Sequence, residues 1–416
     1  MKAILISLIK NSKERWKGLD RLEELEELAK SAQFEVFEKF IQIREHPDPA
    51  YFIGKGKVQE IKEICQKYNI DAVIFDNELT PIQKRNLEKA INKKIIDRTE
   101  LIIEIFRRRA KTSEAKIQVE IAYWQYQLTH LVGLSKEISL SRLAGIPGTR
   151  GPGEQLLENE RRRIKERIRH LHLKLKDIER TKEIQKESRR EFIKISLVGY
   201  TNVGKSTLMN LLTNSNVYVD DKLFATLDAT TRALRIEGIP YKVVLSDTVG
   251  FIRDLPPHLI ASFKATLSVI EDADVILHVI DISHPNVNEH IETVEKILNE
   301  MGLEEKAKIM VFNKIDLVLD KNQIYRFKEK YSDSVFISAK LKIGIDELLR
   351  KIKEVILRQF VEFEIITENY NLYSKIKKLA LIFEEEILDS KIKIKGIIHK
   401  RFYSYVANSN SKHPEY

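Results

Sequence analysis

The feature that most constrains this fold is a glycine-bounded run that directly follows an apolar, strand-like segment. The run consists of Gly199, Tyr200, Thr201, Asn202, Val203, Gly204, Lys205, Ser206 and Thr207, after residues 192–198. A strand, such a loop and then a helix are typical of a phosphate-binding loop, because glycines let the backbone wrap closely around phosphates. We expect Lys205 to reach the outer phosphates and the Ser206 hydroxyl to bind Mg²⁺. The run therefore predicts an α/β domain that holds a nucleotide.

Three motifs farther along the chain indicate which nucleotide is bound. Asp316 follows the apolar segment 309–312, and its carboxylate can accept both N–H donors on the guanine edge. Adenine presents a different pattern and would leave that charge unpaired, which is a strong form of discrimination. The motifs, in order, are Asp247, Thr248, Val249 and Gly250; Asn313, Lys314, Ile315 and Asp316; and Ser338, Ala339 and Lys340. Together with the phosphate loop they predict GTP rather than ATP.

Each of these motifs has an expected role. Asp247 can hold Mg²⁺ through water, and the Gly250 N–H can sense the terminal phosphate. Lys314 is expected along the base plane, and Asn313 is expected to tie two loops together. Ser338 and Ala339 contribute a backbone N–H for the guanine oxygen.

Two further segments are more specific than these motifs. Residues 223–228, followed by 247–256, resemble the switch pair of HflX, a family of ribosome-associated GTPases. The resemblance covers roughly residues 1–355, because it continues upstream through residues 54–57, 97–99, 114–120 and 148–154. Ala229 departs from the family pattern, which carries proline there, and this bears on the stiffness of the first switch.

The resemblance implies the remaining site residues. Thr226 is favoured as the threonine that meets Mg²⁺ and the terminal phosphate, while spacing alone leaves Thr230 open. The metal ligands are then Ser206, Thr226 and Asp247. The first switch contributes Phe224, Ala225, Thr226, Leu227 and Asp228 to nucleotide binding, and the catalytic set is Lys205, Thr226, Gly250 and Asn202.

Two positions bear on hydrolysis. Many GTPases carry a glutamine after the glycine of the second switch to orient the attacking water, but this chain has Phe251. We expect slow intrinsic turnover that a partner accelerates; the alternative, that Phe251 only packs on the sheet, is compatible with this. Asn202 in the phosphate loop either helps to coordinate K⁺ beside the phosphates or only stabilises the loop.

Composition limits the class of protein. The chain has 416 residues, 43% of them hydrophobic and 32% charged, as expected for a soluble protein of several domains. A single cysteine, Cys65, favours a reducing cytoplasm, and no apolar run approaches the length of a membrane span. The net charge of +9 favours an anionic partner, with nucleic acid ahead of lipid. We expect a cytoplasmic monomer.

The sequence divides into four predicted domains. Residues 1–97 alternate strand-like and helix-like segments, which predicts a small parallel α/β domain, and 98–190 form a long antiparallel helical hairpin. Residues 191–358 form the GTP-binding domain. Residues 359–416 are predicted to form a small α+β domain, with a helix at 372–388 and an edge strand at 391–395.

The hairpin carries two heptad stripes joined by a glycine-rich loop. Trp124 lies in the first stripe and is predicted to be a core residue rather than a base-stacking one. The loop, residues 140–153, includes Arg142 and Arg150. The family resemblance implies that it inserts into ribosomal RNA of the large subunit near the peptidyl-transferase region; a flexible solvated loop is the alternative.

The resemblance implies a function. It predicts a GTPase that binds the large ribosomal subunit and couples GTP binding and hydrolysis to the splitting or rescue of ribosomes under stress. Two alternatives remain open at this point: a ribosome-assembly GTPase, and a GTP-dependent signalling switch that binds a protein.

Overall fold

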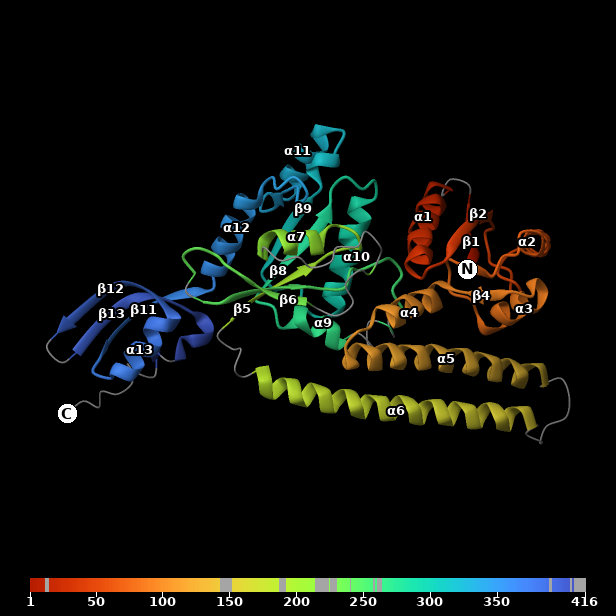
Figure 1. Cartoon of the computed structure of the whole chain (residues 1–416), viewed down its shortest axis with the longest axis horizontal. Helices are drawn as coiled ribbons and strands as arrows, with labels where there is room; N and C mark the ends of the chain where they lie inside the picture. The colour runs from red at the N-terminus through yellow and green to blue at the C-terminus, as the bar shows by residue number, and fades with distance from the viewer. Residues whose placement is uncertain are drawn as a thin grey trace. The chain divides into compact units, whose positions relative to one another are not determined.

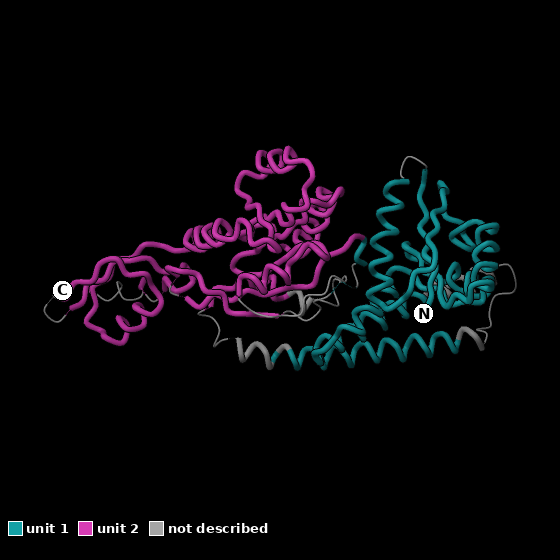
Figure 2. The backbone as a smooth tube through the Cα atoms, turned by 45° about the horizontal axis from the view of Figure 1, so that its top comes forward, with its two compact units in different colours: residues 1–182, 220–228, 254–266 teal, residues 183–219, 229–253, 267–416 magenta. Residues whose placement is uncertain are grey.

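The computed structural model describes residues 1–11, 15–142, 152–186, 192–213, 224, 230–239, 241–256, 259, 264–388, 391–404 and 406–407. The chain forms two compact units, which Figure 2 shows in different colours. The first comprises residues 1–182, 220–228 and 254–266, and the second comprises residues 183–219, 229–253 and 267–416. The division into four domains stays a prediction. Among the described helices, none combines the length and the apolar character that crossing a membrane requires.

The first unit begins with a four-stranded parallel sheet in the order β2-β1-β3-β4 (Figure 1). Seven of the eight residues of β1 are buried, as expected for a parallel strand that is covered on both faces. The predicted alternation of strands and helices is confirmed. The strands are β1 (Lys2–Ile9), β2 (Glu35–Ile43), β3 (Ala72–Phe75) and β4 (Lys94–Ile96), connected by helices α1 (Arg15–Ser31), α2 (Lys55–Lys67) and α3 (Pro81–Ile91).

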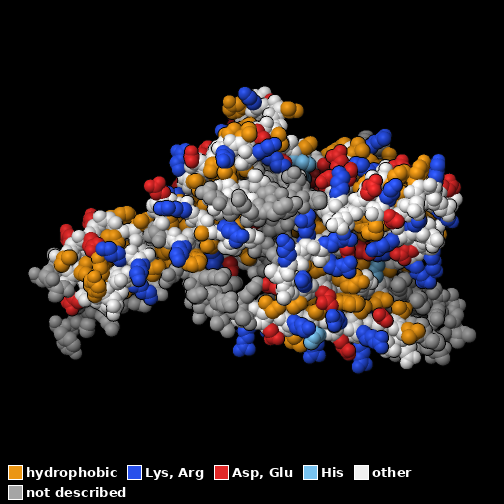
Figure 3. Space-filling model, viewed as in Figure 1, with side chains coloured by type: hydrophobic (Ala, Val, Ile, Leu, Met, Phe, Trp, Pro, Cys, Tyr) orange, Lys and Arg blue, Asp and Glu red, His pale blue; other side chains and the backbone are white. Residues whose placement is uncertain are grey.

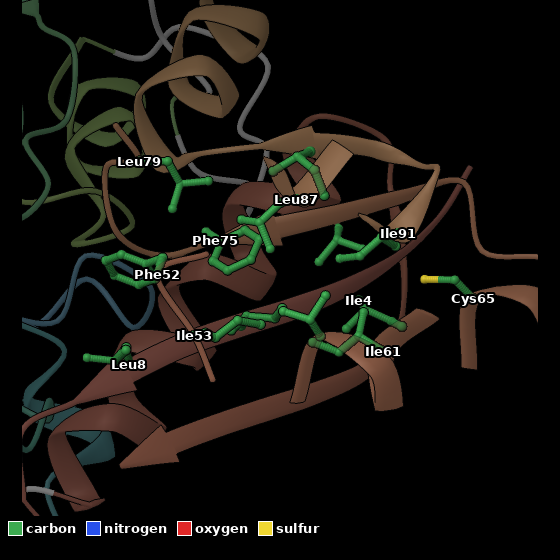
Figure 4. Packing of buried hydrophobic residues seen from close by; sticks show 14 of the residues in the cluster. Ile4, Leu8, Phe52, Ile53, Ile61, Cys65, Phe75, Leu79, Leu87 and Ile91 are labelled. Carbon is green, nitrogen blue, oxygen red and sulfur yellow. The ribbon is translucent and has the colours of Figure 1, made fainter. Parts of the chain in front are cut away.

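Helices α2 and α3 cover one face of this sheet. Figure 4 shows Ile4 of β1 among Ile61 of α2, Leu87 of α3 and Phe75 of β3, all in one buried cluster. Cys65 belongs to the same cluster and is fully buried, so the single thiol of the chain acts as a core residue.

The hairpin follows this sheet within the first unit. Helix α4 (Arg98–Arg109) leads into α5 (Ser113–Arg142), and α6 (Pro152–Lys186) runs back along α5 (Figure 1). Ile121, Ile164 and Leu171 of the two stripes are buried, as a hairpin seam requires. Trp124 is only half-buried, so its prediction as a core residue is wrong. The side chain of Arg142 and residues 143–151, with Arg150, lie outside what the structure describes.

The second unit contains a six-stranded sheet in the order β10-β9-β8-β5-β7-β6. Strand β6 runs antiparallel to β7, and the other described pairs are parallel. The carboxyl ends of parallel strands meet at one sheet edge, which is where ligands bind in such folds. The strands are β5 (Ile193–Val198), β6 (Thr230–Leu234), β7 (Val243–Asp247), β8 (Val275–Asp281), β9 (Lys308–Asn313) and β10 (Val335–Phe336). The helices are α7 (Lys205–Thr213), α9 (Lys264–Glu271), α10 (Val287–Glu300), α11 (Lys321–Lys330) and α12 (Ile345–Leu357).

The chain ends in a small α+β part. Strands β11 (Phe360–Thr367), β12 (Ala380–Leu388) and β13 (Lys391–His399) form an antiparallel sheet in the order β11-β13-β12, joined by α13 (Tyr370–Leu379). The helix predicted at 372–388 is wrong in its second half, because residues 380–388 form β12.

The strand predicted as an edge is the central strand of this sheet. Its lysines are tolerated there because glutamates of both neighbours lie beside them. Lys395 lies opposite Glu364 of β11 and Glu384 of β12, and Lys393 pairs with Glu364 at 3.0 Å and lies opposite Glu386 of β12. Such opposite charges on facing strands stabilise a sheet. The other face of β13 is apolar, and Ile394 and Ile398 are fully buried.

Candidate functional site

The phosphate-binding loop connects β5 to α7, and two of its positions exclude any side chain. A Cβ atom on Gly199 would lie 2.2 Å from the carbonyl oxygen of Val279. Gly204 has a φ of +94°, and its Cβ would lie 2.5 Å from Nδ2 of Asn313. Both contacts are far below van der Waals distance, so the loop keeps this shape only with glycine at both ends.

Lys205 is buried at the start of α7. Its Nζ donates to the carbonyl oxygens of Gly199 at 3.1 Å and Tyr200 at 2.7 Å, so the amine points into the loop. Burial lowers the pKa of Lys205 to about 8, although the nearby Asp247 carboxylate acts in the opposite direction. Anionic phosphate oxygens around the Lys205 amine would favour its charged form and so raise this pKa.

Two oxygen-bearing side chains meet beside the loop. The Ser206 hydroxyl donates to Oδ2 of Asp247, at the end of β7, at 2.6 Å. A hydroxyl and a carboxylate are ligands that Mg²⁺ prefers, so these residues could hold that ion between them. The described residues contain no group of three or more His, Cys, Asp or Glu side chains that could hold a metal ion.

The first switch is described only in part. Ala225, Thr226, Leu227 and Asp228 lie outside the described residues, so the choice of Thr226 stays a prediction. The fallback residue, Thr230, is the first residue of β6. Its neighbour Thr231 forms a hydrogen bond with the Ser246 hydroxyl of β7 at 2.8 Å.

The second switch pairs with the phosphate loop through main-chain atoms. The Thr201 N–H donates to the carbonyl oxygen of Phe251 at 2.8 Å, and the Phe251 N–H donates to the carbonyl oxygen of Gly199 at 3.1 Å. A Cβ on Gly250 would lie 2.8 Å from Cα of Thr201 and 3.0 Å from Nζ of Lys205, so glycine is required for this approach. Phe251 is itself 3% exposed, and its ring offers a water molecule no hydrogen bond.

The base-binding end of the site is organised around Asn313, at the end of β9. Its Nδ2 donates to the carbonyl oxygen of Val203 at 2.8 Å, and its Oδ1 accepts from the Ala339 N–H at 2.9 Å. Asn313 therefore joins its own loop to two others, the phosphate loop and the 338–340 loop, where the sequence predicts that it ties two loops together.

Asp316 and Lys314 complete this end. Oδ1 of Asp316 is buried without a hydrogen-bond partner among the described residues. Leaving a buried acceptor unpaired costs about 1–3 kcal/mol, so the atom suits a ligand that brings N–H donors. Nζ of Lys314 donates to the carbonyl oxygen of Asn202 at 2.8 Å and pairs with Asp281 at 2.7 Å, so the amine joins the phosphate loop to the end of β8.

Several contacts around the site, and the partner residues Glu289, His290 and Asp281, were not predicted from the sequence. The Tyr200 ring stacks on His290 of α10, with centroids 3.7 Å apart and planes inclined by 6°, and its hydroxyl accepts from the Arg253 N–H at 2.9 Å. Arg253 also lies 3.7 Å from Glu289. The sequence carries no signal for these contacts with α10. Asp281 could have been found, since it ends an apolar strand as Asp247 does.

Two residues of the switch segments pack within the first unit. Phe224 is buried, and its ring meets that of Phe106 in α4 edge to face at 4.6 Å. Asp254 forms an ion pair with Arg21 of α1. Arg21 also lies 3.3 Å from Asp76, whose pKa is raised by burial despite its two arginine neighbours.

Three family models match the chain. One, described as GTP-binding GTPase N-terminal, matches residues 19–107, and one described as GTP-binding GTPase Middle Region matches residues 109–189. The third, described as 50S ribosome-binding GTPase, matches residues 194–314 and includes the phosphate loop and Asp247.

Curated relatives match along most of the chain. The GTPase HflX of Caldanaerobacter subterraneus subsp. tengcongensis is 41% identical over 95% of this chain and 90% of the relative. The GTPase HflX of Lacrimispora saccharolytica is 42% identical over 98% and 96%, and that of Escherichia coli K12 is 42% identical over 81% and 79%. A solved GTP-binding protein from Sulfolobus solfataricus in complex with GDP is 26% identical, covers 85% of this chain and 98% of its own, and has a TM-score of 0.47.

Proposed function

The chain belongs to the HflX family of GTPases, and we propose that it binds the large ribosomal subunit and couples GTP binding and hydrolysis to ribosome splitting or rescue under stress. The observation that carries the proposal is the identity of at least 41% over nearly the whole of two HflX relatives, together with the match to a model described as 50S ribosome-binding GTPase. The protein would act as a monomer in the cytoplasm, where ribosomes are found.

The geometry supports two sets of nucleotide-binding residues, one for the phosphates and one for the base. Backbone N–H groups of the loop from Gly199 to Thr207 would hold the phosphates, and the Lys205 amine would neutralise them. The Asp316 carboxylate, whose Oδ1 has no hydrogen-bond partner among the described residues, would accept both guanine N–H donors. Lys314 would cover the base, and the 338–340 loop, which Asn313 holds through Ala339, would contact the guanine oxygen.

Ser206 and Asp247 would hold Mg²⁺, with Thr226 as the ligand from the first switch. The ion supplies positive charge that the phosphates need during transfer. The chain places the Ser206 hydroxyl on α7 and the Asp247 carboxylate on β7. The two oxygen atoms lie 2.6 Å apart.

The coupling to the ribosome would run through the switches. A terminal phosphate that recruits Thr226 and the Gly250 N–H favours one arrangement of both segments, and a partner that prefers this arrangement is then bound more tightly. By linkage, ribosome binding must tighten GTP binding by the same factor. Phe251 leaves the attacking water without a side-chain partner, so intrinsic turnover is expected to be slow and to rise when the ribosome orders the switches.

Asn202 is the residue that we assign to K⁺. It is exposed in the phosphate loop, and its backbone has a left-handed φ of +60°. A cation beside the phosphates would act as a fixed positive charge in the transition state. Turnover should therefore be faster in potassium than in sodium buffer, and Asn202→Ala should remove the difference. Equal rates in both buffers would contradict the assignment.

Arg142 and Arg150 are proposed to contact ribosomal RNA from the hairpin loop. Alanine at both positions should weaken ribosome binding and leave GTP binding unchanged, and equal loss of both would count against this assignment.

Sedimentation with purified ribosomes tests the function directly. With a non-hydrolysable GTP analogue the protein should pellet with large subunits and convert 70S ribosomes into subunits; with GDP, or with Lys205→Ala, it should do neither. Activity on precursor particles alone would favour the ribosome-assembly alternative. Binding that survives RNase and high salt would favour the signalling switch, since phosphate contacts weaken steeply with salt.

A further inference from the structure

A groove lies in the first unit where the end of α4 meets the first half of α5. Its volume is about 320 Å³, near the lower end of the range for small-ligand sites. Ala110 and Val119 form a buried apolar floor. The walls carry two aromatic side chains, Tyr123 and Trp124, and two cationic side chains, Arg107 and Lys116.

The aromatic wall is the first unusual feature. Tyr123 and Trp124 are both half-buried, and their ring centroids lie 5.2 Å apart with planes inclined by 70°. The Trp124 Nε1–H donates to Oε1 of Glu120 at 3.3 Å, which holds the indole in place. A tryptophan kept half in solvent at a concave surface presents an apolar ring face that a planar partner can cover.

The charge around the groove is positive. Arg107 and Lys116 are exposed, and Lys116 has no carboxylate partner among the described residues. Arg107 shares its charge with Glu104, at 2.7 Å. The single acid of the groove, Glu120, is neutralised by Arg167 of α6, whose Nε and Nη2 donate to it at 3.1 and 2.7 Å.

Basic side chains continue along the hairpin, interleaved with acidic ones. Arg163, Lys165 and Arg169 of α6 are exposed, as are Glu158, Glu160 and Glu166 of the same helix, and Figure 3 shows Lys and Arg side chains spread along the hairpin together with Asp and Glu. The phosphate backbone of a nucleic acid that enters the groove would therefore also meet basic side chains along the hairpin.

We propose that this groove binds one unpaired nucleotide of single-stranded RNA. The base stacks on Trp124 or Tyr123, and Lys116 and Arg107 contact the flanking phosphates. Stacking on an aromatic side chain contributes about 1–3 kcal/mol per base and needs no particular sequence. The choice of RNA over DNA rests on the ribosomal partner proposed above; the groove itself is independent of the GTP site.

Fluorescence tests the proposal, because the chain has two tryptophans and Trp16 is 54% exposed on α1. In a Trp16→Phe background, Trp124 is the sole reporter. Titration with a ten-residue oligouridylate in 50 mM potassium chloride should quench its emission saturably, and the affinity should fall at 200 mM. Lys116→Glu should weaken binding at least about tenfold.

The matched control is Lys176→Glu, which makes the same charge change at an exposed position of α6 outside the groove. It should weaken binding about twofold. Trp124→Leu, checked for folding by circular dichroism and measured with labelled RNA, should weaken binding roughly 5- to 100-fold, whereas Trp16→Leu should have no effect.

Three outcomes would overturn the proposal: no saturable binding of the oligouridylate, binding without quenching, or equal effects of Lys116→Glu and Lys176→Glu. These titrations contain no GTP and no ribosomes. A negative result would therefore count against the groove but not against the proposed function, which sedimentation tests separately.

Discussion

The two ends of the nucleotide site are built in different ways. At the base end, the side chain of Asn313 makes two hydrogen bonds that join three loops, and Lys314 is held by a carbonyl oxygen and a carboxylate. At the phosphate end, the second switch is held to the loop by main-chain hydrogen bonds of Phe251. The difference teaches that the base end of the proposed site is organised by side-chain contacts, whereas the second switch is joined to the phosphate loop through main-chain hydrogen bonds.

The largest effect is expected at the base end, from Asp316→Asn. The amide places a donor where guanine also presents donors, so GTP affinity should fall by at least about 100-fold while xanthosine triphosphate gains. Titration calorimetry with both nucleotides measures this. Asp320→Asn is the matched control, because asparagine still caps α11, and it should leave both affinities unchanged. Unchanged GTP affinity in Asp316→Asn would show that the carboxylate does not contact the base.

Asn313→Ala should disturb both binding and stability. It removes two buried hydrogen bonds and leaves the Ala339 N–H and the Val203 carbonyl without partners, at a cost of about 2–4 kcal/mol. A lower melting temperature together with weaker GTP binding is expected by calorimetry, whereas the exposed Asn322→Ala should change neither. If Asn313→Ala kept its melting temperature, the three loops would be held by something else.

The phosphate end should respond to pH through Lys205. Its pKa is lowered to about 8, and bound phosphates must raise it. Below pH 8 the amine is charged with or without GTP, so affinity should be flat; above pH 8 binding must take up a proton, so affinity should fall by up to about tenfold per pH unit. Lys205→Arg cannot titrate in this range and should give a flat profile. A falling profile in that variant would place the titrating group elsewhere.

The smallest effect is expected from Phe251→Gln. Glutamine can orient water, so basal turnover should rise a few-fold, while loss of the buried ring should lower stability by about 1.5–3 kcal/mol. Phe251→Leu keeps an apolar side chain without a hydrogen-bonding group, so it should leave basal turnover unchanged. Fast basal turnover in the unmodified protein would contradict the role given to Phe251.

The contrast between the two ends also marks what the sequence could predict. The phosphate loop and the Asn313 motif follow strands directly, so strand, turn and helix propensities agree locally, and the structure has the predicted fold class. The contacts of Tyr200 with His290 and Arg253 join segments about 50 to 90 residues apart, and no local pattern encodes such a distance.

The prediction was wrong where tertiary contacts override local preference. Residues 380–388 contain three successive glutamates, Glu384 to Glu386, which favour a helix, yet they form a strand because facing lysines of β13 pair with that sequence. Trp124 fits the heptad spacing, but its position near the end of α4 leaves one side of the indole at the groove.

GTP turnover with and without large ribosomal subunits, in potassium buffer, tests the central claim most directly. The account predicts slow turnover by the protein alone and strong stimulation by subunits, abolished in Lys205→Ala. Tight GTP binding with a turnover rate that subunits do not change would contradict it, and the protein-binding switch would then explain the site better.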